Sequence, residues 1–300
     1  IQGQILRDRY RIVKLLGQGG FGAVYRAWDT TLNVPCAVKE SFELSPEGQR
    51  QFLREAQILA GLRHANLPRV TDYFALPGQG QYLVMDFIEG QDLEELRVQA
   101  GGKLSDAQVL PWIDQVCEAL EYLHSQTPAV IHRDIKPANI KITPPDKHNP
   151  QGRAMLVDFG VAKVYDPALR TTMGARAVTP GYSPIEQYGQ GATDTRSDIY
   201  ALGATLYSLL TGQAPPEAPG RAAQDALLPP GQANPAISPA VEDVILKSLR
   251  MNPQLRCQEV GEFRAVISSQ LSISSGQMPV VTQAPASPPI SRSSTRCAPS

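Results

Sequence analysis

Two short runs in the middle of the chain contain the residue types and spacing of a phosphoryl-transfer site. The first is H-R-D-I-K-P-A-N from 132 to 139, and the second is D-F-G from 158 to 160. A carboxylate such as that of Asp134 can orient an attacking hydroxyl and accept its proton. The oxygens of Asn139 and Asp158 are hard ligands that suit Mg²⁺ bridging the phosphates of ATP. The two runs therefore predict one base and two metal ligands.

A glycine-rich run, G-Q-G-G-F-G-A-V, begins at Gly17 and includes Gly19 and Gly22. Glycines at this spacing let backbone amides approach phosphate oxygens without interference from a Cβ atom. In a dinucleotide-binding fold the run would lead from a strand into a helix, but here Ala23 to Trp28 reads as a second strand. A hairpin that covers phosphates fits better, although an ordinary hairpin turn would explain an isolated run equally well.

The elements that must position these residues fall into two regions. The first region, residues 10–88, contains strand-like runs interrupted by one amphipathic helix, predicted from Gln49 to Leu62. The expected strands are Tyr10 to Leu16, Ala23 to Trp28, Pro35 to Glu40, Arg69 to Ala75 and Tyr82 to Phe87. After Gly90 the pattern becomes helical, with the strongest helices predicted at Ala107 to Ser125, Ser197 to Leu210 and Pro239 to Leu249. Asp86 to Gly90 is the expected hinge, where backbone groups could bind an adenine edge.

With these motifs, the chain resembles the eukaryotic-like bacterial Ser/Thr protein kinases from about Tyr10 to about Ile267. The resemblance implies an α+β, two-lobed protein-kinase-like fold, with a small antiparallel-sheet lobe carrying one main helix and a larger, mainly helical lobe. We expect an N-terminal lead-in at 1–9 and a kinase domain at 10–271, divided into lobes at 10–88 and 89–271. The expected activity is transfer of the γ-phosphate of Mg-ATP to protein Ser and Thr hydroxyls, with Mn²⁺ as an alternative metal.

The resemblance also assigns roles to single residues. Lys39 would contact the α- and β-phosphates while paired with Glu55, and Lys136 would contact the γ-phosphate. Taken alone, Lys39 and Glu55 would be read as two solvated surface charges. The expected nucleotide contacts are Leu16, Gly17, Gln18, Gly19, Gly20, Phe21, Gly22, Val24, Ala37, Lys39, Met85, Asp86, Ile88, Lys136, Asn139 and Asp158. His132 is expected to be structural rather than catalytic. Lysine at 136, with Thr179 before P-G-Y, implies Ser/Thr rather than Tyr specificity.

A third group of residues is expected to control activation. In the resembling family, an arginine in the position of Arg133 often gathers a phosphate from the segment after D-F-G, and Thr171 and Thr172 lie in that segment. A phosphothreonine there could make charge-assisted bonds that order the loop. Autophosphorylation at Thr171 or Thr172 is the hypothesis, and polar residues in an ordinary flexible loop are the alternative.

The resemblance predicts structural roles for residues of the second region. Glu186 in S-P-I-E should pair with the distant Arg256, and Asp198 should hold the backbone of the catalytic loop. Lys141 departs from the family pattern, because an apolar residue is usual beneath the adenine ring. Its aliphatic stem could form that floor. The polar stretch Pro144 to Gly152 should be an enlarged surface hairpin.

Composition limits the other possibilities. A formal net charge of -1 gives no overall field for nucleic acid or an anionic membrane, so we expect no contact with either. Four scattered cysteines form no C-x-x-C pair, which favours a reducing cytoplasm. No apolar run is long enough to span a bilayer. The chain begins at Ile1 and ends in a Ser/Pro-rich segment, 272–300, predicted to be a disordered tail or linker, passive or phosphorylated. We therefore expect a piece of a longer protein, whose other parts could carry a membrane anchor or sensor.

Expected partners are protein substrates bearing Ser or Thr, and the family resemblance adds a small-lobe homodimer that favours trans-autophosphorylation. The sequence also leaves two other classes of function open. An ATP-binding scaffold that has lost catalysis would act through the helical lobe or the tail. An interaction module without nucleotide would require every matched residue to be accidental.

Overall fold

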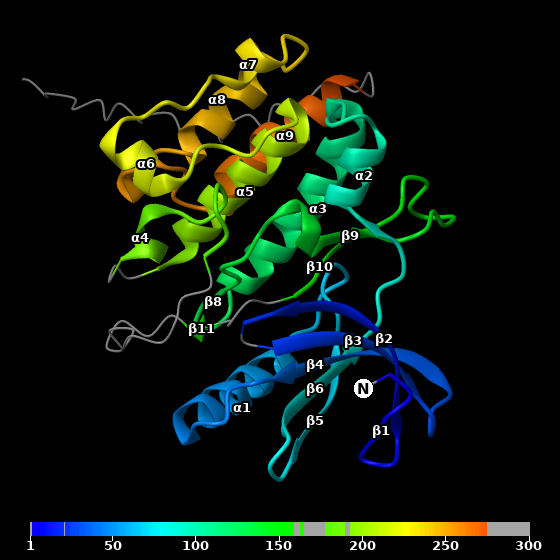
Figure 1. The fold of residues 1–300 in the computed structure, drawn as a ribbon. Helices are drawn as coiled ribbons and strands as arrows, with labels where there is room; N and C mark the ends of the chain where they lie inside the picture. Colours follow the sequence, from blue (N-terminus) through cyan, green and yellow to red (C-terminus); the bar gives the residue numbers. More distant parts are fainter. Residues whose placement is uncertain (1, 21, 159–162, 165–177, 190–192, 275–300) are drawn as a thin grey trace, which may run out of the picture.

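The chain folds into a sheet-rich lobe and a larger helical lobe, joined by one extended connection after residue 86 (Figure 1). The computed structural model describes residues 2–20, 22–158, 163–164, 178–189 and 193–274. The predicted two-lobed α+β architecture is confirmed. In the described residues, no helix combines the length and the apolar character needed to cross a membrane.

The small lobe is a six-stranded sheet in the order β1-β2-β3-β4-β6-β5, with antiparallel pairing throughout. Its strands are β1 (Ile5–Leu6), β2 (Tyr10–Gly19), β3 (Gly22–Asp29), β4 (Val34–Ser41), β5 (Val70–Leu76) and β6 (Gly80–Asp86). Side chains of β3 alternate strictly between buried and half-buried, as expected for a sheet with two unlike faces. One face carries a core in which Phe74 stacks between Tyr10 and Tyr82.

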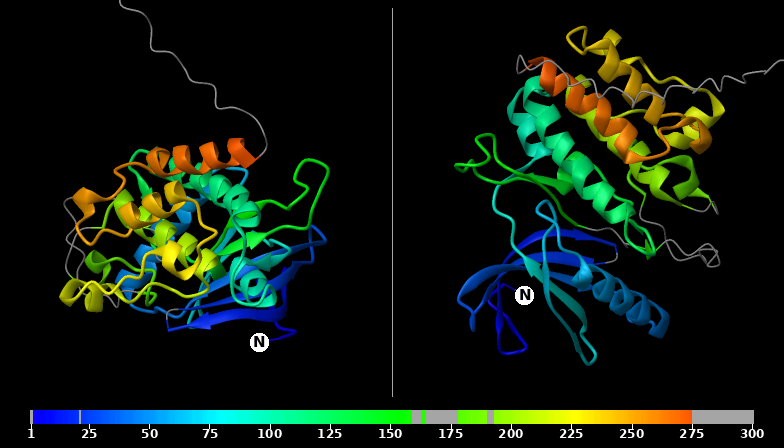
Figure 2. Two further views of the ribbon diagram at one scale, coloured as in Figure 1. Left: turned by 90° about the horizontal axis from the view of Figure 1, so that it is seen from above. Right: turned by 180° about the vertical axis from the view of Figure 1, so that it is seen from behind.

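Helix α1 (Pro46–Gly61) lies against β5 and β6 on the other face of this sheet (Figure 2). Ser45 starts the helix by accepting a hydrogen bond from the Gly48 amide at 3.1 Å, and proline occupies the first turn. Its buried side chains are Phe52, Glu55, Ala56 and Leu59, a helical spacing that presents one stripe to the sheet. Glu55 is the one acidic member of that stripe, so burial of α1 also fixes a carboxylate.

The large lobe is built around helix α5 (Thr195–Thr211), whose side chains from Ser197 to Leu210 are all buried. A helix that is buried all round must lie in the centre of its lobe. Helices α3 and α8 pack against it, and α9 packs against both of these (Figures 1 and 2). The remaining elements are β7 (Gln91–Asp92), α2 (Leu93–Gln99), α3 (Asp106–His124), β8 (Val130–Ile131), η1 (Pro137–Asn139), β9 (Ile140–Ile142), β10 (Ala154–Leu156), β11 (Lys163–Val164), α4 (Ile185–Tyr188), α6 (Ala218–Ala223), α7 (Pro230–Ala233), α8 (Pro239–Ser248), η2 (Pro253–Leu255) and α9 (Val260–Ser274).

Local sequence explains where the main helices begin and end. Asp194 caps α5 by accepting from the Arg196 amide at 2.9 Å, and Gly212 ends the helix at a φ of +86° that favours glycine. Ser105 and Gln108 form a reciprocal cap at the start of α3. These signals lie in the sequence itself, so the predicted positions of α3, α5 and α8 agree with the structure to within a few residues.

Two boundaries differ from the expectation. Residues 1–9 are more than a lead-in, because β1 pairs with Tyr10 and Arg11 and adds a strand to the sheet. Helix α9 continues to Ser274, past the expected domain end at 271. Leu271 packs against the large core, and the Ser272 hydroxyl donates to the Ser268 carbonyl at 3.0 Å, so the helix has a reason to persist into the Ser-rich segment. Residues 275–300 lie outside the described residues.

Candidate active site

The glycine-rich run is the β2–β3 hairpin that the sequence predicts. Gly17 pairs with Val24 and Gly19 with Gly22 across the two strands. A Cβ atom on Gly22 would lie 2.1 Å from the Glu40 carbonyl oxygen, so the hairpin can pack on β4 only with glycine there. Leu16, Gln18 and Gly20 complete the expected phosphate cover, and Phe21 lies outside the described residues.

Lys39 lies between two carboxylates that come from different parts of the chain. Its Nζ is 3.7 Å from Glu55 Oε1 on α1 and 3.5 Å from Asp158 Oδ1, just beyond β10. Burial works against the ammonium, but the two carboxylates outweigh it and raise the pKa of Lys39 above its ordinary value. Lys39 thus lies within ion-pair distance of Glu55, and its ammonium stays charged at neutral pH.

The C-terminal end of α1 is anchored to the large lobe, which fixes the helix that carries Glu55. The His64 ring stacks on Tyr122 of α3 at 5.2 Å, and the Arg63 amide donates to the Tyr122 hydroxyl at 2.8 Å. The Asn66 side chain donates to the Ala154 carbonyl of β10 at 2.8 Å. These contacts join the segment after α1 to α3 and β10, and the predictions from sequence did not include them.

Asp134 lies among hydrogen-bond donors. The Lys136 ammonium is 2.8 Å from its Oδ2, the Thr179 hydroxyl donates to its Oδ1 at 2.7 Å, and the Asn139 amide donates to its Oδ2 at 2.8 Å. Burial disfavours the carboxylate, but Lys136 and Thr179 outweigh it and hold the pKa of Asp134 below its ordinary value. The group is therefore ionised and able to accept a hydrogen bond from an attacking hydroxyl.

Asn139 and Asp158 have the donor chemistry expected for a hard cation. Asn139 Nδ2 also donates to the Asp134 backbone carbonyl at 2.8 Å, which leaves the amide oxygen as the atom available to a metal. The Asp158 carboxylate is nearly half exposed and has Lys39 on one side. A buried amide oxygen on Asn139 and a partly exposed carboxylate on Asp158 are the hard donors that suit Mg²⁺, which keeps several waters and takes few protein ligands.

Asp198 holds the catalytic loop by its backbone, as the sequence predicts. The fully buried carboxylate accepts from the His132 amide at 2.9 Å and the Arg133 amide at 2.8 Å, and it also contacts His124 Nε2 at 2.9 Å. Burial lowers the pKa of His132, so its ring is neutral inside the core and suits the predicted structural role. His124, on α3, is a contact that sequence reasoning missed.

The expected adenine-binding residues lie on paired positions of β4 and β6 and in the connection that follows β6. Ala37 on β4 pairs directly with Met85 on β6, and β6 ends at Asp86, followed by Ile88 in the extended connection. Lys141 on β9 does not simply supply an aliphatic floor, because its ammonium donates to the Gly90 carbonyl at 3.2 Å. The loop from 143 to 153 is a mostly exposed hairpin, as expected.

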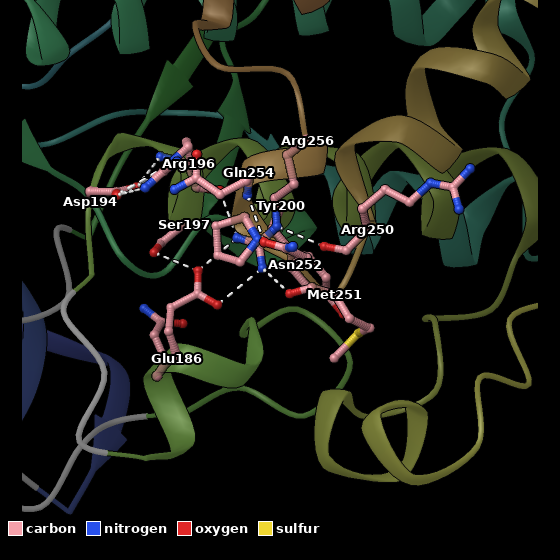
Figure 3. A network of polar contacts seen from close by, with 12 residues as sticks. Glu186, Asp194, Arg196, Ser197, Tyr200, Arg250, Met251, Asn252, Gln254 and Arg256 are labelled. Atoms are coloured by element: carbon pink, nitrogen blue, oxygen red, sulfur yellow. Dashed lines mark hydrogen bonds and ion pairs between the residues drawn. The ribbon is translucent and has the colours of Figure 1, made fainter.

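The Glu186–Arg256 pair is the centre of a network of polar contacts in the large lobe (Figure 3). Arg256, with a fully buried side chain, binds both carboxylate oxygens of Glu186 at 2.6 and 3.0 Å. The Ser197 hydroxyl also donates to Glu186 at 2.9 Å, and the Arg256 guanidinium lies 5.0 Å from the Tyr200 ring centroid. The predicted ion pair is present with bidentate geometry, so α4 is tied to both α5 and the segment before α9.

The structure thus brings Lys39, Glu55, Asp134, Lys136, Asn139 and Asp158 to the boundary between the lobes. The supporting residues Arg133, Asp198, Glu186 and Arg256 lie in the large lobe. Thr171 and Thr172 fall outside the described residues. Sequence reasoning gave Thr179 a role in specificity but missed its hydrogen bond to Asp134. It also missed Gln187, whose amide donates to the Arg133 carbonyl at 3.0 Å. No local pattern marks Gln187, because the contact joins residues far apart in the chain.

The chain matches the family model described as protein kinase domain over residues 10–267. It is 32% identical over 276 residues to a probable serine/threonine-protein kinase of Clostridium acetobutylicum, covering 89% of this chain and 40% of that protein. It is 33% identical over 287 residues to the serine/threonine-protein kinase PknB of Mycobacterium leprae, covering 91% of this chain and 44% of that protein. The chain therefore spans about two fifths of the length of these curated relatives.

A similar solved structure is the kinase domain of PknI from Mycobacterium tuberculosis, with a TM-score of 0.69 and 25% sequence identity over 90% of this chain and 99% of that one. The fold, the match over nearly the whole described chain and the named relatives agree. The chain belongs to the protein kinase domain family, as a eukaryotic-like bacterial serine/threonine kinase catalytic domain.

Proposed function

We propose that this domain transfers the γ-phosphate of Mg-ATP to Ser and Thr hydroxyls of proteins, with Asp134 as the base. The observation that carries the proposal is the bond from the Thr179 hydroxyl to Asp134 Oδ1 at 2.7 Å, beside Lys136 Nζ. A β-hydroxyl and a carboxylate at this distance have the geometry that general-base catalysis requires of an incoming hydroxyl. An incoming Ser or Thr would make the same kind of bond to the carboxylate.

The other charged residues would act on the phosphates. Lys39, held by Glu55, suits the α- and β-phosphates, and Lys136 suits the developing charge on the transferred group. A Mg²⁺ ion bound by Asn139 and Asp158 would neutralise charge on the phosphates and orient them. Catalysis would then depend on positioning and electrostatics, with the β2–β3 hairpin covering the nucleotide and Met85 to Ile88 receiving adenine.

Regulation by Thr171 or Thr172 is part of the same proposal. Arg133 has a φ of +70°, a conformation that is strained for a non-glycine residue, and its amide and carbonyl are held by Asp198 and Gln187. The fixed backbone keeps the Arg133 side chain rooted directly beside Asp134. Such an arginine could gather a phosphothreonine and couple the loop to the catalytic aspartate next to it.

We also propose protein substrates, small-lobe self-association and a cytoplasmic setting. Ile5 on β1, Leu32 in the β3–β4 turn and Val34 on β4 are each about half exposed or more, which is compatible with a homodimer contact through the small lobe. Cys36, Cys117 and Cys257 are free and buried, as suits a reducing compartment.

The test of function is phosphorylation of an unstructured protein substrate by the parent, by Asp134→Asn and by Asp243→Asn. Asp243 is an exposed carboxylate on α8, so it controls for loss of one negative charge. We expect Asp134→Asn to lower kcat by about 10²- to 10⁴-fold, because a positioned base contributes that much, with ATP binding retained. Asp243→Asn should match the parent. A parent that binds Mg-ATP without turnover would support the scaffold instead.

A further inference from the structure

The connection from Asp86 to Gly90 is the segment whose backbone would meet adenine, and its far end is closely packed. Gly90 has a φ of +120°, and a Cβ atom there would lie 1.9 Å from the Ile142 carbonyl oxygen of β9. The connection therefore turns against the large lobe at a point that only glycine can occupy.

The first residue of the connection is held by an arginine from the start of the neighbouring strand. Arg69, just before β5, directs its Nε at Asp86 Oδ2 at 3.0 Å, and its backbone amide donates to the same oxygen at 3.1 Å. The Asp86 amide donates back to the Arg69 carbonyl at 2.9 Å. Because the carboxylate and the amide of Asp86 are both bound to Arg69, the carbonyl is the polar group of Asp86 left to face a nucleotide.

A second arginine covers the next residue. The Arg26 guanidinium on β3 lies 4.8 Å from the centroid of the Phe87 ring, within the range of a cation–π contact. Arg26 pairs with Ala37, which in turn pairs with Met85. Directly opposed residues of adjacent strands share a face, so Arg26 lies in the same row as two expected adenine contacts.

A third cation, from the large lobe, binds the last residue of the connection. Lys141 on β9 donates from its ammonium to the Gly90 carbonyl at 3.2 Å, and β9 belongs to the large lobe. Arg69, Arg26 and Lys141 come from a loop and two separate strands. They fix the connection at its start, its second residue and its end.

We propose that Arg26 and Lys141 are positioning residues for adenine nucleotide: together with Arg69 they brace the connection 86–90 so that its backbone is set to bind the base before ATP arrives. The inference rests on the proposed function, in that it names residues serving the nucleotide half of the same site. A braced backbone loses less freedom on binding, so the brace acts on affinity. It does not touch the phosphates, which are held by Lys39 and the catalytic loop.

The experiment compares Arg26→Met and Lys141→Met, which keep aliphatic stems, with the parent and with Lys14→Met. Lys14 on β2 is the matched control, because it is an exposed cation directly opposite Arg26 in the same cross-strand row. Mg-ATP affinity is measured by titration calorimetry, and KM for ATP and kcat are measured in parallel. Phe87→Leu and the double variant Arg26→Met/Phe87→Leu complete a double-mutant cycle, which measures the coupling between Arg26 and Phe87.

We expect Arg26→Met and Lys141→Met each to weaken Mg-ATP binding and raise KM for ATP by about three- to ten-fold, as one cation–π contact or charged hydrogen bond allows. We expect kcat of both variants to stay within about two-fold of the parent value, since the substitutions remove only binding that is equal in the ground state and the transition state. Affinity, KM and kcat of Lys14→Met should all stay within about two-fold of the parent values. In the Phe87→Leu background, Arg26→Met should have little further effect.

Unchanged affinity in both variants would overturn the inference, as would a fall in kcat with KM unchanged, or an Arg26→Met effect that persists fully without the Phe87 ring. A parent that binds Mg-ATP but transfers no phosphate would refute the proposed function, while the affinity ratios would still decide the brace. A parent that binds no Mg-ATP would overturn both.

Discussion

Asp134 shows how neighbouring donors, rather than its own residue type, define a catalytic carboxylate. Lys136, Thr179 and Asn139 each donate to it, and the same Asn139 amide also fixes the Asp134 carbonyl. A carboxylate in this setting has its pKa below the ordinary value and remains ionised at neutral pH. In the proposed reaction it would orient the attacking hydroxyl and accept its proton.

Asp198 supports a prediction about pH and stability. Burial opposes its charge, but the His124 hydrogen bond and the charges and amides around it outweigh burial, and the pKa of Asp198 falls below its ordinary 3.8. A group whose pKa is lowered on folding stabilises the protein above its unfolded pKa, and that contribution is lost as pH falls through the folded pKa. We expect Asp198→Asn to lower the free energy of unfolding by about 2 to 4 kcal/mol near neutral pH, because buried backbone donors lose a charged acceptor.

Denaturant titrations of the parent and Asp198→Asn at a series of pH values provide the measurement. The difference in unfolding free energy should begin to shrink once the pH drops below the ordinary Asp value of 3.8. Carboxylates elsewhere titrate in both proteins and largely cancel. A difference that stays constant down to the lowest pH at which the parent remains folded would contradict the lowered pKa.

Among the elements, the β2–β3 hairpin contains one glycine that close packing requires and one that packing does not require. A Cβ on Gly22 would meet the Glu40 carbonyl at 2.1 Å, whereas one on Gly19 would meet nothing within 4 Å. Gly22→Ala should therefore destabilise the folded protein by about 1 to 3 kcal/mol through overpacking. Gly19→Ala should leave stability within about 0.5 kcal/mol, as an open surface site does.

For ATP binding, Gly19→Ala should have the clear effect, although it leaves stability almost unchanged. A methyl group at Gly19 would hold the hairpin backbone away from the phosphates, so we expect KM for ATP to rise by about five- to ten-fold in a protein of parental stability. Thermal denaturation and steady-state kinetics measure both quantities. If Gly19→Ala bound ATP like the parent, the hairpin would not cover the phosphates.

Local patterns predicted the elements well and their long-range contacts poorly. The apolar stripe of α1 marked that helix to within a few residues, and family motifs located Asp134, Asp158 and Arg256. The contacts of His124 and Gln187 join segments distant in sequence, and no local pattern records them. The strand β1 was missed because a two-residue run has too few positions to show alternation.

At the scale of the whole molecule, two ion pairs differ in how deeply they are buried and therefore in their expected contribution to stability. The Glu186–Arg256 pair is almost wholly buried, whereas Lys247–Glu262 has both side chains about half exposed. We expect Glu186→Gln to cost about 3 to 5 kcal/mol of unfolding free energy, because it leaves the Arg256 charge buried and uncompensated. Glu262→Gln, the matched control, should cost under about 1 kcal/mol.

Urea denaturation of the two variants measures this contrast. Because Glu186 ties α4 to α5 and to the segment before α9, Glu186→Gln should also raise KM for a protein substrate more than KM for ATP. Equal costs for Glu186→Gln and Glu262→Gln would mean that the buried pair does not organise the large lobe.

In the proposed reaction, the two lobes together form a working Ser/Thr phosphotransferase around Asp134. Incubation of the purified domain with Mg-ATP beside Asp134→Asn, followed by phosphopeptide mass spectrometry, tests whether they do. We predict phosphate on Ser or Thr residues of the parent alone, with Thr171 or Thr172 among them. Phosphate in neither protein, although both bind Mg-ATP and a generic substrate is present, would contradict the claim.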